Sequence, residues 1–194
     1  MKVVIGMVFA AAFAATSAFA DGHASWTSVD SESSVAFGSI KNDSNGEVHH
    51  FEQVSGTVSE TGELVVKIEL LSVNTQIDIR NERMIELLFP EGQPEASLTG
   101  QVDMEALNAL EVGATTLMDV EGTLSFGTVE TTIDASMLVA RLSDERLLVT
   151  TSDFIMLPTA NIGIDAGVDQ LMKLAGLSSI TRVSPVSVRM VFTQ

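Results

Sequence analysis

Residues 64–89, LVVKIELLSVNTQIDIRNERMIELLF, join two different hydrophobic periodicities. At the start of the stretch every second side chain is apolar, at Leu64, Val66, Ile68 and Leu70. A period of two is typical of a strand with one buried face. Met84, Leu87 and Leu88 follow at helical spacing, with charged residues among them. The stretch therefore predicts a half-buried strand that leads into an amphipathic turn of helix.

The alternating pattern recurs on both sides of this stretch, separated by short turns. We predict roughly eight strands, near residues 35–37, 47–59, 64–70, 95–103, 118–126, 129–139, 146–151 and 186–192. Asn45-Gly46 is expected to form the first hairpin turn, because both residues tolerate positive φ. Short helices are expected at 104–111, capped by Asp103, and at 165–177, ended by Gly176.

Many short strands with little helix predict an all-β fold. An antiparallel eight-stranded barrel would remove exposed strand edges and enclose room for side chains or one small ligand. The periodicity fits a two-sheet sandwich nearly as well. No internal repeat or low-complexity linker divides the chain, so residues 21–194 are expected to form one domain.

Residues 1–20 have the pattern of a secretory signal peptide. Lys2 supplies the positive end, residues 3–15 the apolar run, and Ala18-Phe19-Ala20 a small-x-small cleavage site. The apolar run is short for a membrane span and no basic cluster follows it, so cleavage after Ala20 is expected. The chain contains no cysteine, which excludes a disulfide framework and leaves the core to stabilise the fold.

The chain is strongly acidic, with a formal net charge of −16. Loss of Lys2 with the signal peptide would make this −17, since no acid is removed with it. Such a surface repels nucleic acid and anionic lipid headgroups, so neither is expected as a partner. No second apolar run is long enough to cross a bilayer.

The order of residues in the opening stretch is similar to that of a known family. The strand ends in Ser72-Val73-Asn74-Thr75, then come Arg80-Asn81-Glu82-Arg83-Met84 and Phe89. Weaker similarity lies at Val120-Glu121-Gly122-Thr123-Leu124 and at residues 154–165. On these residues the chain resembles the YceI-like family of periplasmic lipid-binding proteins. It departs from many members at Ser33 and Arg83, where they have histidine, and at Asn81, where they have aspartate.

The resemblance implies an extended lipocalin-like barrel whose interior, the lumen, holds a long polyisoprenoid such as a quinone tail. It also implies the periplasm and often a homodimer. The departures put in doubt any role that depended on the missing histidine or aspartate, but they leave the expected fold unchanged.

A lumen for a long apolar ligand needs aliphatic and aromatic walls, and the chain has 9 Met and 9 Phe. The alternative is that these residues pack against one another and fill the interior. The candidate lining residues are Phe37, Phe51, Leu70, Met84, Leu88, Phe89, Phe126, Ile133, Met137 and Phe154.

Arg80 completes the candidate site, because a guanidinium in a mostly apolar segment could bind a quinone or phosphate head at a tunnel mouth. The competing interpretation pairs Arg80 with a local acid such as Asp78 and Arg83 with Glu86 along the helix.

The sequence indicates neither a metal site nor catalysis. His49 and His50 are adjacent, so on a regular strand they would face opposite ways and could not chelate one metal. Cleavage after Ala20 would expose Asp21-Gly22-His23, a terminus able to surround Cu(II) or Ni(II), although chance explains it better. Cysteine nucleophiles and the common catalytic motifs are absent, and a hydrolase would need a carboxylate pair in a cleft.

The sequence therefore predicts a periplasmic carrier for a long isoprenoid or quinone-type lipid, with no cofactor beyond that lipid and no enzymatic activity. The runner-up is an acidic secreted interaction module, acting in stress or surface association, with a filled core and no ligand. A packed interior and an exposed apolar patch would favour the runner-up.

Overall fold

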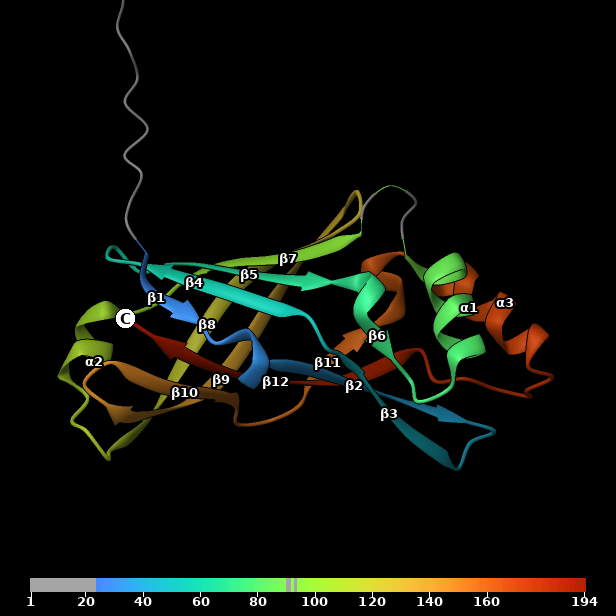
Figure 1. Ribbon diagram of the computed structural model, residues 1–194. Helices are drawn as coiled ribbons and strands as arrows, with labels where there is room; N and C mark the ends of the chain where they lie inside the picture. The colour runs from blue at the N-terminus through green and yellow to red at the C-terminus, as the bar shows by residue number, and fades with distance from the viewer. Residues whose placement is uncertain (1–23, 90–91, 93) are drawn as a thin grey trace, which may run out of the picture.

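The structure is a computed structural model that describes residues 24–89, 92 and 94–194 (Figure 1). The expected signal peptide, residues 1–20, the terminal motif Asp21-Gly22-His23 and Pro90 lie outside the described residues. The strands form a 12-stranded antiparallel sheet. They are β1 (Ala24–Ser28), β2 (Ser34–Lys41), β3 (Asn45–Phe51), β4 (Val54–Ser59), β5 (Glu63–Glu69), β6 (Val73–Asn74), β7 (Glu95–Gln101), β8 (Thr115–Phe126), β9 (Val129–Ser143), β10 (Arg146–Thr151), β11 (Ile155–Pro158) and β12 (Val183–Thr193).

Several of these strands are halves of longer, interrupted ones. On one side of β12, β1 pairs with its last residues and β2 pairs with residues 186–189. On the other side, β10 pairs with residues 189–193 and β11 pairs with residues 183–186. The next composite strand, β3 with β4, pairs with β2 and β1, and β6 with β5 continues the pattern. Counted as composites, eight antiparallel strands close into a barrel through the contact of β12 with β1 and β2.

The closed barrel confirms the predicted fold class and removes the sandwich alternative. Closure pairs the edges that a sandwich would leave open. The predicted inward face of β5 is confirmed, because Leu64 and Val66 are buried while Lys67 points outward. The inward phases of β8 and β9 implied by the candidates Phe126, Ile133 and Met137 agree with the structure, because all three side chains line the cavity.

Two local predictions were wrong. The first hairpin turns at Asn42 and Asp43, which have φ of 48° and 64°, whereas Asn45 and Gly46 already pair within β3. Asn and Asp occupy the left-handed region at little cost, so the earlier pair serves as the turn. The predicted strand 47–59 is broken between β3 and β4, because the backbone amides of Glu52 and Gln53 donate to Ser72 instead of to a neighbouring strand.

Helices cover both ends of the barrel (Figure 1). α1 (Asp78–Leu88) and α3 (Asp165–Leu174) pack together at one end, and α2 (Met104–Ala109) lies at the other. The Asp103 carboxylate accepts from the amides of Glu105 and Ala106, which confirms the predicted cap of α2. α3 ends before Gly176, whose φ of 63° lets the chain turn away.

Short 3₁₀ turns complete the fold, at Asp30–Glu32, Leu70–Ser72 and Thr159–Ile162. The contact between α1 and α3 depends on a glycine. A Cβ on Gly167 would overlap the carbonyl oxygen of Leu87, so only glycine allows the two helices to approach this closely. No helix among the described residues is both long enough and apolar enough to cross a bilayer.

Candidate binding cavity

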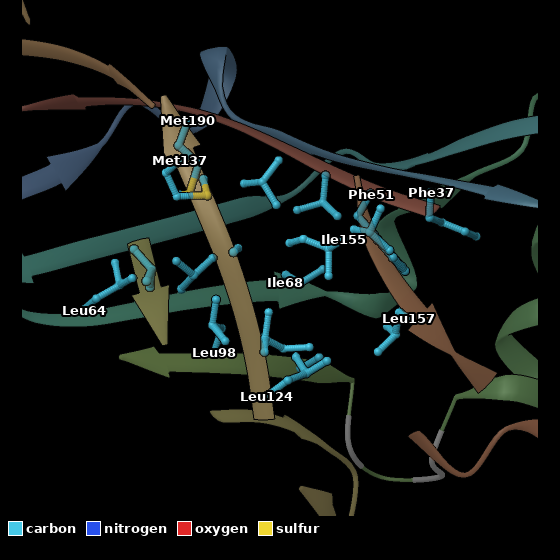
Figure 2. Close-up of a pocket in the computed structure, with 18 of the residues that line it drawn as sticks. Phe37, Phe51, Leu64, Ile68, Leu98, Leu124, Met137, Ile155, Leu157 and Met190 are labelled. Carbon is cyan, nitrogen blue, oxygen red and sulfur yellow. The ribbon is translucent and has the colours of Figure 1, made fainter. Parts of the chain in front are cut away.

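The barrel encloses a cavity of about 240 Å³. On the same measure one buried water needs roughly 10–15 Å³, so the interior is far from filled. Figure 2 shows labelled side chains from β2, β3, β5, β7, β8, β9, β11 and β12 projecting into this space. The filled core required by the runner-up function is therefore absent from the described part of the barrel.

The cavity wall is almost wholly apolar. Among the described lining residues only Thr159 and Ser184 carry hydroxyl groups, and Trp26 carries an N–H. The Ser184 hydroxyl donates to the Gly38 carbonyl at 2.8 Å. The Thr159 hydroxyl lies against the Asp165 carboxylate and the Arg182 carbonyl. Because both hydroxyls are engaged, the walls favour hydrocarbon over water.

The void arises where inward side chains are too short to meet across the barrel. Ile133 and Ala135 point inward from β9 yet remain partly exposed, because they face empty space rather than another wall. Gly122 on β8 also faces inward, and a Cβ there would press on the Thr99 carbonyl of β7. Gly122 therefore lets β7 and β8 approach closely, and the short side chain of Ala135 leaves space open inside the barrel.

A line of phenylalanine rings crosses the end of the cavity that α1 and α3 cover. Phe37 and Phe51 stack at 5.1 Å between ring centroids, Phe51 lies 5.9 Å from Phe89, and Phe89 lies 6.2 Å from Phe126. Such offset and edge contacts stabilise aromatic pairs beyond the area they bury. The four rings join β2, β3 and β8 to the segment after α1 and form a firm apolar wall.

Most of the candidate lining residues come together in this cavity. The structure places nine of them in its wall: Phe37, Phe51, Leu70, Met84, Leu88, Phe89, Phe126, Ile133 and Met137. Phe154 and Arg80 do not line it. Phe154 is 69% exposed, because β11 begins one residue later and directs Ile155 and Leu157 inward instead.

Arg80 lies on α1, where its guanidinium donates to Glu47 on β3 at 2.8 Å. The competing interpretation was therefore right that Arg80 is paired, but wrong to choose Asp78, because α1 folds over β3 and brings a more distant carboxylate within reach. Among the described ion pairs, none joins Arg83 to Glu86.

Glu47 bridges two cations at this edge. Lys41 donates to one carboxylate oxygen at 2.9 Å and Arg80 to the other. Burial raises the pKa of the Glu47 carboxyl, but the Lys41 hydrogen bond and the two positive charges outweigh burial and hold the pKa below its ordinary value of 4.5. The pair stabilises the contact of α1 with β3 and leaves neither charge aimed into the cavity.

His49 faces inward beside this ion pair and is only 4% exposed. Its ring lies 5.3 Å from that of Phe37, and its Nε2 is 3.4 Å from the Ser39 hydroxyl. Burial, followed by the nearby Arg80 charge, lowers the pKa of His49 from its ordinary value of 6.5. His49 does not line the cavity in this structure.

The sequence reasoning missed much of the wall. Among the residues it omitted are Trp26, Leu98, Leu107, Ile155, Leu157 and Ile162. Alternation along residues 95–101 could have identified Leu98, but Leu107 comes from α2 and Ile162 from a 3₁₀ turn, where a period of two gives no signal. In the part of the chain that is described, no group of three or more His, Cys, Asp or Glu residues could hold a metal ion.

Comparisons with known proteins identify the family. A solved structure of a polyisoprenoid binding domain from Saccharophagus degradans, implicated in plant cell wall breakdown, is similar with a TM-score of 0.85. The two sequences are 34% identical over 88% of this chain and 99% of the other. The chain belongs to the YceI-like family.

A second structure, BcnA from Burkholderia cenocepacia, shares the fold with a TM-score of 0.64 at 13% identity, over 84% of this chain and 97% of that one. No family model matches the chain, and no similar protein is found among curated proteins.

Two departures from the YceI-like pattern have structural roles in this chain. The Asn81 side-chain oxygen accepts from the amide and the hydroxyl of Thr75, at 2.8 and 2.7 Å, and so fixes the start of α1. An aspartate would accept the same two bonds. The Ser33 hydroxyl donates to the Val29 carbonyl and joins the segment before β2 to β12. Both side chains form hydrogen bonds that support the expected fold, and neither residue lines the cavity.

Proposed function

We propose that this protein binds a long isoprenoid lipid in the barrel lumen and carries it through the periplasm. The single observation that supports this most strongly is the apolar cavity, whose few polar side chains are almost all engaged. A wall of this kind offers hydrocarbon a dry surface and offers polar solutes almost no partner. The polyisoprenoid binding domain that shares this fold gives independent support for the ligand class.

The energetics favour a long, branched chain. Each CH₂ moved from water into the lumen contributes about 0.8 kcal/mol, so several isoprene units outweigh the cost of ordering a flexible lipid. Methionines such as Met84, Met118 and Met137 lie in the wall, and their unbranched side chains adapt to methyl branches along a ligand. A stiff or polar ligand would gain less from this surface.

Binding, rather than catalysis, is the activity we propose. The hydroxyls of Thr159 and Ser184 are engaged in hydrogen bonds, and the described wall carries no carboxylate or histidine to act as an acid or base. The relative of known fold that supports the ligand class is itself described as a binding domain.

Export and cleavage after Ala20, and association of two copies, are parts of the same proposal that rest on the sequence. Edman sequencing of protein expressed with its leader and recovered from periplasmic extract would test the first, with Asp21 as the expected new terminus. Light scattering of that protein would test the second.

The proposed function is tested by purifying the protein from bacteria without detergent and analysing it by native mass spectrometry. We expect an adduct that organic extraction releases as an isoprenoid. The stripped protein should then take up a geranylgeranyl-substituted benzoquinone. Bare protein throughout, with no uptake of that quinone or of squalene, would refute the proposed function.

A further inference from the structure

The two ends of the cavity differ in the polar atoms they offer. At the end covered by α2, Trp26 lines the cavity and is 1% exposed. Its indole Nε1–H has no acceptor among the described residues. A buried N–H without an acceptor is unfavourable, and native proteins rarely retain one unless a ligand or water completes it.

Arg141 supplies a second donor at the same end. Its guanidinium carbon lies 5.6 Å from the centroid of the Trp26 ring. Its terminal nitrogens donate to the carbonyls of Leu107 on α2, at 3.1 Å, and of Asp144, at 3.2 Å. Its buried Nε–H also finds no acceptor in the described structure, although Arg141, unlike Trp26, is not among the residues that line the cavity.

Arg141 is also held without a carboxylate. Although the chain has 26 acids for 10 bases, none of the ion pairs found among the described residues includes Arg141. Backbone carbonyls fix its position but do not neutralise its charge. The α2 end therefore presents the unpaired N–H of Trp26 in the cavity wall and a second unpaired N–H on the charged Arg141 beside it, and both suit an oxygen acceptor.

The opposite end has no unpaired donor in the described part of the cavity wall. The rings of Phe37, Phe51 and Phe89 form its wall, and His49, whose buried Nδ1 also lacks a hydrogen-bond partner among the described residues, does not line the cavity as Trp26 does. The cations near that end, Lys41 and Arg80, are already bound by Glu47. This end suits the hydrocarbon tail of a ligand.

We propose that the α2 end binds the polar head of the isoprenoid, through an uncharged oxygen such as a quinone carbonyl that accepts from Trp26 and Arg141. This inference rests on the proposed function and adds to it the orientation and the class of headgroup. An isoprenyl phosphate offers the same acceptor chemistry, but it would bury more negative charge than one arginine, already bound to two carbonyls, can balance. The tail extends from the α2 end toward the phenylalanine wall.

The first test uses Trp26 as its own probe, because the chain has one Trp and no Tyr. The stripped mature protein is titrated with geranylgeranyl benzoquinone and, separately, with squalene, which lacks a polar head. We expect the quinone at saturation to quench most of the Trp26 emission, while squalene leaves most of it. Full occupancy by the quinone, verified by native mass spectrometry, with undiminished emission would overturn the proposal.

The second test compares variants by competition in native mass spectrometry. Trp26→Phe keeps a ring but removes the N–H, and Arg141→Met keeps length but removes the donor and the charge. Each is expected to weaken binding of the quinone about five- to tenfold, the effect of one hydrogen bond, and to change squalene binding less than twofold. His49→Leu is the matched control at the other end and should leave both affinities unchanged.

The outcomes separate this inference from the function on which it rests. Equal losses for both lipids would show that Trp26 and Arg141 only shape the wall, and a selective loss in His49→Leu would place the head at the opposite end. Tighter binding of geranylgeranyl monophosphate than of the quinone would overturn the uncharged head. Each of these leaves lipid binding intact, whereas failure of the wild-type protein to bind any of the three lipids would overturn both proposals. If Trp26→Phe does not fold, the quenching measurement and Arg141→Met still decide.

Discussion

Replacing Ala135 by phenylalanine would show directly whether the lumen is empty space that a ligand needs. Ala135 points inward from β9, lines the cavity and is partly exposed to it. The substitution adds about six carbons inside the barrel. If these displace a similar number of ligand carbons, at about 0.8 kcal/mol each, the loss is at most about 5 kcal/mol, or between about three and four orders of magnitude in affinity. A ligand that shifts along the lumen would lose less.

The same substitution has the opposite effect on the ligand-free protein. In a packed core an added ring causes strain that costs about 1–3 kcal/mol of the free energy of unfolding. In a hollow barrel the ring buries itself in existing space, so the stripped protein should unfold at the same or a higher urea concentration. We therefore expect lower affinity together with unchanged or greater stability.

The assay is quinone uptake by native mass spectrometry and urea unfolding followed by circular dichroism, both on stripped protein. Thr132→Phe is the matched control, because it places the same ring on the exposed outer face of the same strand. Thr132→Phe should change neither the affinity for the quinone nor the stability to urea appreciably. If Ala135→Phe lowers the stability by several kcal/mol and leaves affinity intact, the reasoning from an open lumen is wrong.

Three further predictions test the surrounding structure. Gly167→Ala should lower the free energy of unfolding by about 1–3 kcal/mol, because its Cβ meets the Leu87 backbone, whereas Gly46→Ala, with open space around it, should be neutral in the same urea titration. Leu70→Ala, at a site 1% exposed, should cost about 2–5 kcal/mol in the stripped protein and less with lipid bound; an identical cost in both states would argue against contact with ligand. Because burial lowers the pKa of His49 in the folded state, the unfolded state takes up the proton first as the pH falls below about 6.5, so stability should decline from there until the folded pKa is passed. His49→Leu should flatten that decline in thermal unfolding measured across the pH range. The stabilising contribution of Glu47 is lost only below about pH 4.5, so it does not overlap with this decline. An unchanged pH profile in His49→Leu would show that His49 does not cause the loss of stability.

The inward faces of the strands were predictable because they depend on a period of two that is visible within each strand. Leu64, Val66 and Ile68 alternate without interruption, and the same holds for the inward residues of β9 and β12. Where the chain has no uninterrupted alternation, the prediction failed. Phe154 precedes a strand of four residues, and the phase of β11 is set by its pairing with β12 rather than by its own sequence.

The contacts of Arg80 and Trp26 show a second limit of prediction from the sequence. Glu47 is 33 residues from Arg80 along the chain, and only the packing of α1 over β3 selects it over the closer Asp78. The meeting of Trp26 with Arg141 likewise needs β1 and β9 to face each other across a closed barrel. No local pattern carries information about which distant side chains meet, so these two interactions had to be seen in the fold.

The sequence by itself determined which residues of the long, regularly alternating strands turn inward and that the family is YceI-like, because local alternation and motif order suffice for both. The tertiary structure alone decided that the interior is hollow and where its unused N–H donors lie. Hollowness depends on the difference between the space that eight tilted strands enclose and the summed volume of the side chains they direct inward. That difference belongs to all the strands together, and no single stretch of sequence contains it.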